Sequence, residues 1–158
     1  MKLTTTRRAR ESDSRDLFLW RNDPATRSAS LNTSVIAWED HAAWYSEALC
    51  KPTIAFYISQ SPTVESESIG MCRFNISEDQ TSAEVSINLN PEYRGKGFAQ
   101  GVLHDSIQHF LEDFANVGEL TATIRTSNSA SIKIFHSENF EIQNEEDGVY
   151  YLARSLRS

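Results

Sequence analysis

Hydrophobic residues recur with helical spacing in four parts of the chain. The clearest stripe contains Leu103, Ile107, Phe110, Leu111 and Phe114, which fall on one face of a helix between polar side chains. The other three helices are expected over these ranges: Ser12–Asn22, Trp38–Leu49 and Ser129–Ser137.

Seven short segments with strand character lie around these helices. They are Leu3–Ala9, Thr53–Ser59, Ile69–Ile76, Ala83–Leu89, Leu120–Ile124, Phe140–Asn144 and Val149–Leu156. Polar Ser59–Ser68 is expected to connect one hairpin, and Asp147-Gly148 is expected to turn another. Three consecutive strands before the strongest helix favour a mixed sheet over a doubly wound parallel sheet.

Composition and charge narrow the class of protein. The 158 residues suit one domain, residues 1–158, with the hydrophobic and charged content of an ordinary soluble globular protein. The formal net charge of −7 disfavours general nucleic-acid binding, because a surface of that sign repels phosphate backbones. No apolar run reaches membrane-spanning length and no secretory signal pattern is visible, so we expect a cytoplasmic protein without a membrane anchor. The isolated cysteines, Cys50 and Cys72, predict free thiols, and no cluster of His and Cys residues predicts a metal site.

A glycine-rich segment, Tyr93–Gly101, lies between a predicted strand and the strongest helix. Glycine lets a backbone approach phosphates closely, and the first turn of the following helix has free N–H groups that bind anions. Arg94 and Lys96 add positive charge beside them. The spacing fits no P-loop, because Lys96 is followed by Gly97, and no dinucleotide fingerprint, because Gln100 replaces the third glycine.

Two motifs resemble those of the GNAT superfamily of N-acetyltransferases. Arg94, Gly97 and Ala99 fit its acyl-CoA pyrophosphate loop, [QR]-x-x-G-x-[GA]. Asn128–Phe140 is similar to its second motif, N-x-x-S-x-x-x-[YF]-x-x-x-G-F, with Asn139 in place of the usual glycine. The resemblance extends over nearly the whole chain. It implies an α/β fold of the α+β type, with a mixed, mostly antiparallel sheet of about seven strands and about four helices, splayed between the fourth and fifth strands.

The resemblance also implies acetyl-CoA as donor substrate and assigns residues that hold it. The acetyl group and pantetheine would lie along the backbone of Asn88, Leu89 and Asn90, and the Leu89 N–H would stabilise the developing oxyanion. The amides of the loop would hold the pyrophosphate: Arg94, Gly95, Lys96, Gly97, Phe98 and Ala99. Residues of the second motif would also contact the cofactor: Asn128, Ser131 and Phe135. For Asn128, a helix N-cap is an equally sound role.

The sequence leaves the general base and the general acid of this reaction open. Glu84 matches the position where relatives often place a general base, although an exposed carboxylate without a catalytic role explains it equally well. Phe135 stands where many relatives have a tyrosine as general acid, and it has no proton to donate. Other residues could replace the tyrosine as general acid: Tyr93, Ser131 and His136. A thiol is also a fair leaving group without an acid.

The first helices are expected to form the acceptor site. Their motifs, W-R-N-D-P from Trp20 and W-x-x-H-x-x-W from Trp38, are similar to a branch that acetylates the 4-amino group of UDP-linked amino sugars in pseudaminic acid synthesis. Aromatic faces stack on uracil or sugar, and arginines bind phosphate. The candidate acceptor residues are Trp20, Arg21, Asn22, Arg27, His41, Trp44 and Arg73. Taken singly, the tryptophans, Tyr45 and His41 are expected to belong to the core.

Two alternatives remain open. Ribosomal-protein alanine acetyltransferases share part of this pattern, and a net charge of −7 suits a basic protein substrate with a free N-terminus. A CoA-binding module without turnover would explain the missing hydroxyl at Phe135. The sequence leaves the oligomeric state open, a homodimer included.

Overall fold

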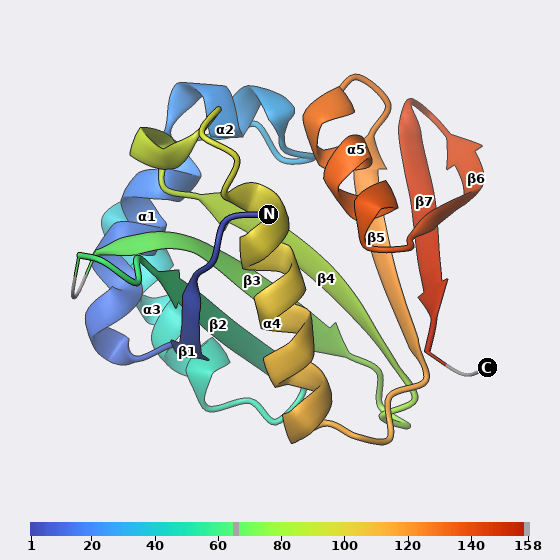
Figure 1. Ribbon diagram of the computed structural model, residues 1–158. Coiled ribbons are helices and arrows are strands. Elements are labelled where there is room, and N and C mark those ends of the chain that lie inside the picture. Colours follow the sequence, from blue (N-terminus) through green and yellow to red (C-terminus); the bar gives the residue numbers. More distant parts are fainter. Residues whose placement is uncertain (65–66, 157–158) are drawn as a thin grey trace.

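A single seven-stranded sheet runs through the protein, with the strand order β1-β2-β3-β4-β5-β7-β6 (Figure 1). The computed structural model describes residues 1–64 and 67–156. The strands are β1 (Thr5–Arg8), β2 (Ile54–Gln60), β3 (Ser68–Ile76), β4 (Ser82–Leu89), β5 (Glu119–Arg125), β6 (Glu141–Glu146) and β7 (Val149–Ser155). Neighbouring strands are antiparallel except β4 and β5, which are parallel. The mixed sheet predicted from the sequence is therefore confirmed.

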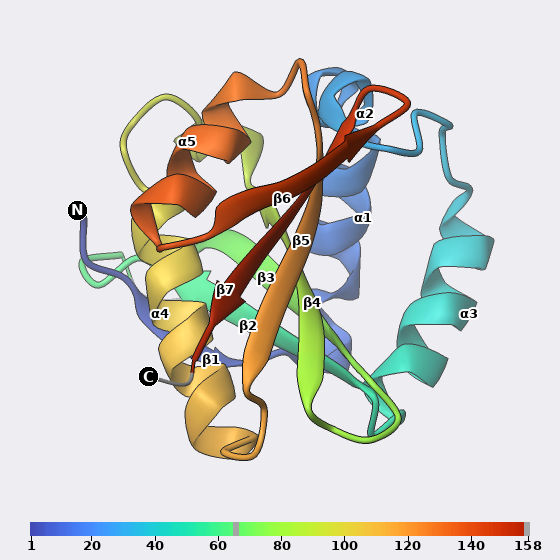
Figure 2. The same cartoon turned by 90° about the vertical axis from the view of Figure 1, so that its right-hand side faces the viewer.

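Helices cover both faces of this sheet, as Figure 2 shows. They are α1 (Ser14–Asn22), α2 (Pro24–Ala29), α3 (Trp38–Leu49), α4 (Ala99–Asp113) and α5 (Ser129–Ser137). Two short 3-10 helices, Glu11–Asp13 and Pro91–Tyr93, precede α1 and the glycine-rich loop. The helices α4 and α5 lie on one face, and α1 and α3 lie on the other. Among the described residues, no helix is long and apolar enough to cross a membrane.

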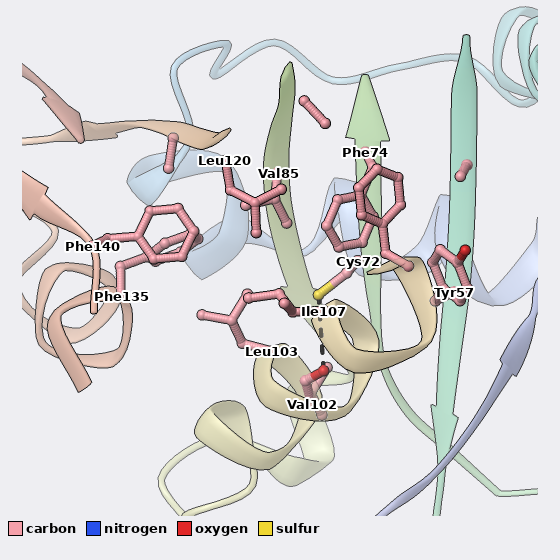
Figure 3. Packing of buried hydrophobic residues seen from close by; sticks show 14 of the residues in the cluster. Tyr57, Cys72, Phe74, Val85, Val102, Leu103, Ile107, Leu120, Phe135 and Phe140 are labelled. Atoms are coloured by element: carbon pink, nitrogen blue, oxygen red, sulfur yellow. Dashed lines mark hydrogen bonds between the residues drawn. The ribbon is translucent and has the colours of Figure 1, made fainter. Parts of the chain in front are cut away.

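The larger core lies between the sheet and the helices α4 and α5. The rings of Phe74 on β3 and Phe110 on α4 stack with centroids 4.1 Å apart. Phe74, Leu103 and Ile107 are fully buried in this core (Figure 3). A smaller cluster on the opposite face joins α1 and α3 to the sheet. Its buried members are Leu17, Trp20, Tyr45, Ala48, Phe56, Ile58 and Met71. The helical stripe of α4 thus packs as its spacing predicts.

The sequence correctly predicted the seven strands and four of the five α-helices. The helix α2 was missed, because Pro24 was interpreted as a stop signal after α1. The structure shows Pro24 instead at the first position of a new helix, where a missing N–H costs nothing. Asp23 caps this helix, since its side chain accepts from the N–H groups of Ala25 and Thr26.

Turn residues explain how the C-terminal elements connect. Asn139 has a φ of +69° after α5, a left-handed conformation that asparagine tolerates better than most residues. The usual glycine of the second motif is therefore replaced by the nearest substitute. Asp147 and Gly148 also have positive φ, at +52° and +75°, which is the turn predicted between β6 and β7. The predicted Ser59–Ser68 connection does join the antiparallel β2 and β3, although Glu65 and Ser66 within it lie outside the described residues.

Candidate active site

The strands β4 and β5 separate soon after they begin. They pair only where Ser82–Glu84 face Glu119–Thr121, and from Val85 onward β4 has no partner on that side. The splay that was predicted between the fourth and fifth strands is therefore present. Glu84 stands at its apex, at the last residue that still pairs with β5.

Backbone groups in the second half of β4 face this opening. The Asn90 N–H donates to the Ile69 carbonyl at 2.8 Å, so even-numbered residues of β4 direct their N–H and C=O groups toward β3. Because the direction alternates along a strand, Ile87 and Leu89 direct theirs away from β3. The Leu89 N–H can therefore meet a ligand that lies along the unpaired edge. Asn90 itself holds the end of the strand, since its Nδ2 donates to the Ser68 carbonyl at 3.0 Å.

The glycine-rich loop leads from β4 into α4. Gly95 and Gly97 have φ values of +70° and +82°, a conformation that most residues with a side chain avoid. The helix begins at Ala99, and no side chain caps its first turn. A helix start with open N–H groups and no acidic residue in the first turn suits an anion. This loop therefore fits the pyrophosphate site that was predicted from Arg94 to Ala99.

The N-terminal residues add a basic group that the sequence analysis missed. A side chain at Gly101 would clash with the Lys2 backbone, so the chain start lies directly on the first turn of α4 (Figure 1). The Lys2 ammonium lies 4.7 Å from the centre of the Phe98 ring. The Lys96 ammonium lies over Tyr93, 5.8 Å from its ring centre. Only the tertiary structure brings Lys2 to the loop, since about 95 residues separate them along the chain.

Arg94 joins this loop to the opposite layer of the fold. Its Nη1 donates to Asp23 Oδ2 at 2.8 Å, the same carboxylate that caps α2. Partial burial raises the pKa of Asp23. The Arg94 hydrogen bond and the amides of Thr26 and Ala25 lower it by more than burial raises it, so the net shift of the pKa is downward. The loop and the N-terminus of α2 therefore share one ionised carboxylate.

The second motif is placed mainly by packing and capping. Asn128 accepts from the Ser131 N–H at 3.2 Å, which confirms the N-cap geometry for α5. Phe135 is 2% exposed and packs edge-on against Phe140 in the core (Figure 3). Its burial leaves it little surface for the cofactor contact that the resemblance implied. His136 is held by the Phe140 carbonyl at 2.9 Å.

None of the three substitute acids has a favourable setting for proton donation. A hydrogen bond to Glu67 raises the pKa of Tyr93 to about 12. Ser131 lies in the first turn of α5. His136 lies in the last turn of the same helix, where its Nδ1 is hydrogen-bonded to the Phe140 carbonyl. A thiol with a pKa near 8.5 is a fair leaving group without a dedicated acid.

On the side of the sheet toward α1 and α3 lie Glu84 of β4, Arg73 of β3 and Arg21 of α1. Glu84 is exposed there, and Arg73 on β3 lies opposite Ser86 of β4. The Arg73 guanidinium lies 5.6 Å from the centre of the Trp44 ring. Arg73 Nε and Arg21 Nη1 are buried and have no hydrogen-bond partner among residues 1–64 and 67–156.

The other predicted acceptor residues divide between packing and surface. Trp20 is 4% exposed and His41 is 5% exposed, with His41 Nε2 at 3.0 Å from the Ser14 carbonyl. Both residues belong to the interior, as the sequence predicted for each one considered singly. They therefore offer a ligand little surface. Trp44 is 42% exposed, so its expected core position is wrong.

Hydrogen bonds organise the segment that follows α1. The Asn22 side chain donates to the Ile36 carbonyl and accepts from the Ile36 N–H. Arg27 Nε donates to the Asn22 carbonyl at 3.1 Å. These two predicted acceptor residues therefore hold the connection between α1 and α3, beside Arg21.

An open hollow of about 380 Å³ adjoins Glu84 on the same face. Its walls come from β4, β5, β6 and β7, and they include Glu119, Thr121, Thr123 and Tyr151. The sequence analysis did not identify this hollow, since its walls come from four strands far apart in the chain. The splay thus has the glycine-rich loop on the α4 side and a carboxylate with open space on the other.

Comparison with known proteins agrees with this geometry. Residues 4–141 match the family model described as an acetyltransferase (GNAT) domain. The chain belongs to this family, and it is an acetyl-CoA-dependent N-acetyltransferase of the GNAT type. No curated protein sequence matches the chain significantly.

Solved structures share the fold over almost the whole chain. The protein yncA of Salmonella typhimurium, solved with its cofactor acetyl-CoA, is 19% identical, with a TM-score of 0.77 over 99% of this chain and 96% of that one. A Vibrio cholerae spermidine N-acetyltransferase in complex with CoA and spermine is 16% identical, with a TM-score of 0.84 over 97% and 95%. A ribosomal-protein-alanine N-acetyltransferase from Brucella melitensis is 22% identical, with a TM-score of 0.77 over 96% and 99%. Because the last two are named for different acceptors, their likeness supports the fold and leaves the acceptor to be argued from this chain.

Proposed function

We propose that the protein transfers an acetyl group from acetyl-CoA directly to a primary amine at the β4–β5 splay. The observation that carries this proposal is the position of Glu84 and the Leu89 N–H on opposite halves of β4, at the two ends of the edge that β5 leaves unpaired. The donor enters from the α4 side, where the loop from Arg94 to Ala99 binds its pyrophosphate. The acceptor approaches from the face of α1 and α3.

The chain's own residues then perform two tasks. Glu84 accepts a proton from the amine, directly or through water, because an alkyl ammonium is mostly protonated at neutral pH. The Leu89 N–H donates to the carbonyl oxygen as negative charge develops on it. Acetyl-CoA supplies the acetyl group as a thioester. A nitrogen–carbon bond forms, the carbon–sulfur bond breaks, and CoA leaves as the thiolate. The ammonium gives one proton to Glu84, which passes it to solvent, and the nitrogen loses a second proton to solvent as the amide forms.

For the acceptor, we propose the 4-amino group of a UDP-linked amino sugar. Support comes from the W-R-N-D-P motif and from exposed Trp44. It also comes from Arg73, which interacts with both Glu84 and Arg21. A basic peptide N-terminus is the second candidate, favoured by the formal net charge of −7. A CoA-binding module without turnover is the third. The reaction would take place in the cytoplasm, where acetyl-CoA is available, and the oligomeric state stays open, a homodimer included.

Thiol release from acetyl-CoA tests these candidates with purified protein. We expect release that depends on a UDP-linked 4-amino-4,6-dideoxy sugar, with acetyl-CoA binding measured in parallel by calorimetry. Release with alanine-ended basic peptides but not with the sugar would move the acceptor to proteins. Tight acetyl-CoA binding without release for any amine would overturn the catalytic proposal and leave a binding module.

A further inference from the structure

Two arginines on the acceptor side have buried nitrogen atoms without partners. Arg21 lies in the last turn of α1, and Arg73 lies in the middle of β3. Neither Arg21 Nη1 nor Arg73 Nε has a hydrogen-bond partner among the described residues. Burying part of a guanidinium without a partner is costly. Both residues remain partly exposed, so an anion bound beside their accessible atoms would offset that cost.

The two guanidinium groups are close enough to affect each other. Burial lowers the pKa of Arg73, Glu84 raises it, and the like charge of Arg21 lowers it again. Burial also lowers the pKa of Arg21, and the charge of Arg27 adds to this effect. Arg27 therefore acts on Arg21, Arg21 on Arg73, and Arg73 on Glu84, so three arginines and one carboxylate form a chain of charges, on a protein whose formal net charge is −7. This local excess of positive charge suits an anion and opposes a polycation.

Trp44 shapes the same place. Its ring meets Phe56 edge-on at 5.9 Å and lies against the Arg73 guanidinium, while 42% of the residue stays exposed. The indole thus shields Arg73 from solvent on one side and offers a stacking surface to an organic ligand. Charge recognition and aromatic stacking are available together beside Glu84.

From this arrangement we infer that Arg21 and Arg73 bind an anionic group of the acceptor, a carboxylate or a phosphate, and hold its amine near Glu84. The inference deepens the proposed function and rests on it. The same positive charges disfavour the protonated amine, so they increase the fraction of neutral nucleophile. Acceptors that carry only positive charge do not fit this site.

Anion binding can be measured without turnover. The protein is first saturated with CoA, so that the loop from Arg94 to Ala99 is filled, and is then titrated with inorganic pyrophosphate by calorimetry. We expect binding that weakens at least tenfold in Arg73→Met and in Arg21→Met. Arg15→Met is the matched control, because it removes the same charge from an exposed position on α1. Circular dichroism confirms that each variant is folded, and Arg73→Lys provides a second variant that keeps the charge.

Turnover measurements then identify the source of the anion. UDP-linked amino sugar is compared with the free amino sugar, free amino acids are compared with their amides, and spermidine serves as the cationic acceptor. We expect the anionic member of one pair to be preferred, and Arg73→Met to raise its KM at least tenfold with a smaller effect on kcat. Equal weakening by Arg15→Met, absence of pyrophosphate binding, or a preference for spermidine would overturn the inference. Arginine-dependent pyrophosphate binding without any turnover would support the anion site and count against the proposed catalysis.

Discussion

Arg94 and Asp23 form an ion pair at 2.8 Å across 71 positions of the chain, and it joins the glycine-rich loop to the helix α2. Both side chains are partly shielded from solvent, with about a quarter to a third of each exposed. The pair therefore connects the proposed donor side of the splay with the proposed acceptor side. Sequence reasoning assigned both residues to motifs and did not connect them.

The shared carboxylate predicts a stability effect that can be divided into two parts. Asp23→Ala removes the cap of α2 and the partner of Arg94, and we expect a loss of about 1–2 kcal/mol at pH 7. Asp23→Ser keeps an oxygen that can cap α2, so it is expected to lose less. Urea unfolding followed by circular dichroism measures both values. Equal losses in the two variants would show that capping contributes nothing.

The same pair predicts a pH dependence. The pKa of Asp23 is lower in the folded protein than its usual value of 3.8, so its contribution to stability is full above that value. The contribution disappears as the pH falls through the lowered pKa. The difference in unfolding free energy between wild type and Asp23→Ala is therefore expected to shrink from pH 7 to pH 2. An unchanged difference at pH 2 would contradict an ionised Asp23 in the fold.

A single substitution in the glycine-rich loop is expected to have a strong effect on acetyl-CoA binding. Gly97→Asp places a carboxylate where the pyrophosphate is expected and strains a backbone with φ of +82°, so acetyl-CoA binding is expected to be lost. Gly148→Asp is a matched control, since φ there is +75° and the residue lies in the β6–β7 turn with open space around it. Calorimetry with acetyl-CoA distinguishes the two. Unchanged affinity in Gly97→Asp would remove this loop from the donor site.

Glu84 and Glu119 line the same hollow, but only Glu84 lies on the splayed strand β4. Glu84→Gln is expected to lower kcat about 10²- to 10⁴-fold and to remove the acidic limb of the pH profile, because a general base would be lost. Glu119→Gln changes the charge equally and is expected to keep most of the activity. An unaltered pH profile in Glu84→Gln would exclude it as the base.

Asn139 occupies a left-handed position that the family usually gives to glycine. Asn139→Ala is expected to destabilise the fold by about 1–2 kcal/mol, the cost of forcing a β-carbon into this conformation. Asn139→Gly is expected to be close to neutral. Asn116→Ala, at an exposed position where no positive φ occurs, serves as the control in urea unfolding. A loss in Asn139→Gly as large as in Asn139→Ala would contradict this explanation.

Local patterns in the sequence determined much of this protein. The bounds of α3 and α5 agree with their hydrophobic spacing, and the alternation in Ala83–Leu89 predicted β4 to within one residue. The left-handed glycines of the loop also follow from sequence, because only a few residue types adopt that backbone conformation. Each of these features depends on residues within one element or one turn. Their physics is short-ranged and can be predicted without the rest of the fold.

The tertiary structure alone decided which distant residues meet. Lys2 lies on the first turn of α4, and Arg94 pairs with Asp23. Arg21 and exposed Trp44 come from two helices to Arg73 on β3, and Arg73 interacts with Glu84. A helical or strand period tells which residues share a face, but not how much of that face a neighbouring layer covers. Trp44 shows this difference. It shares a helix face with fully buried Tyr45, but the sheet does not cover it and 42% of it stays exposed.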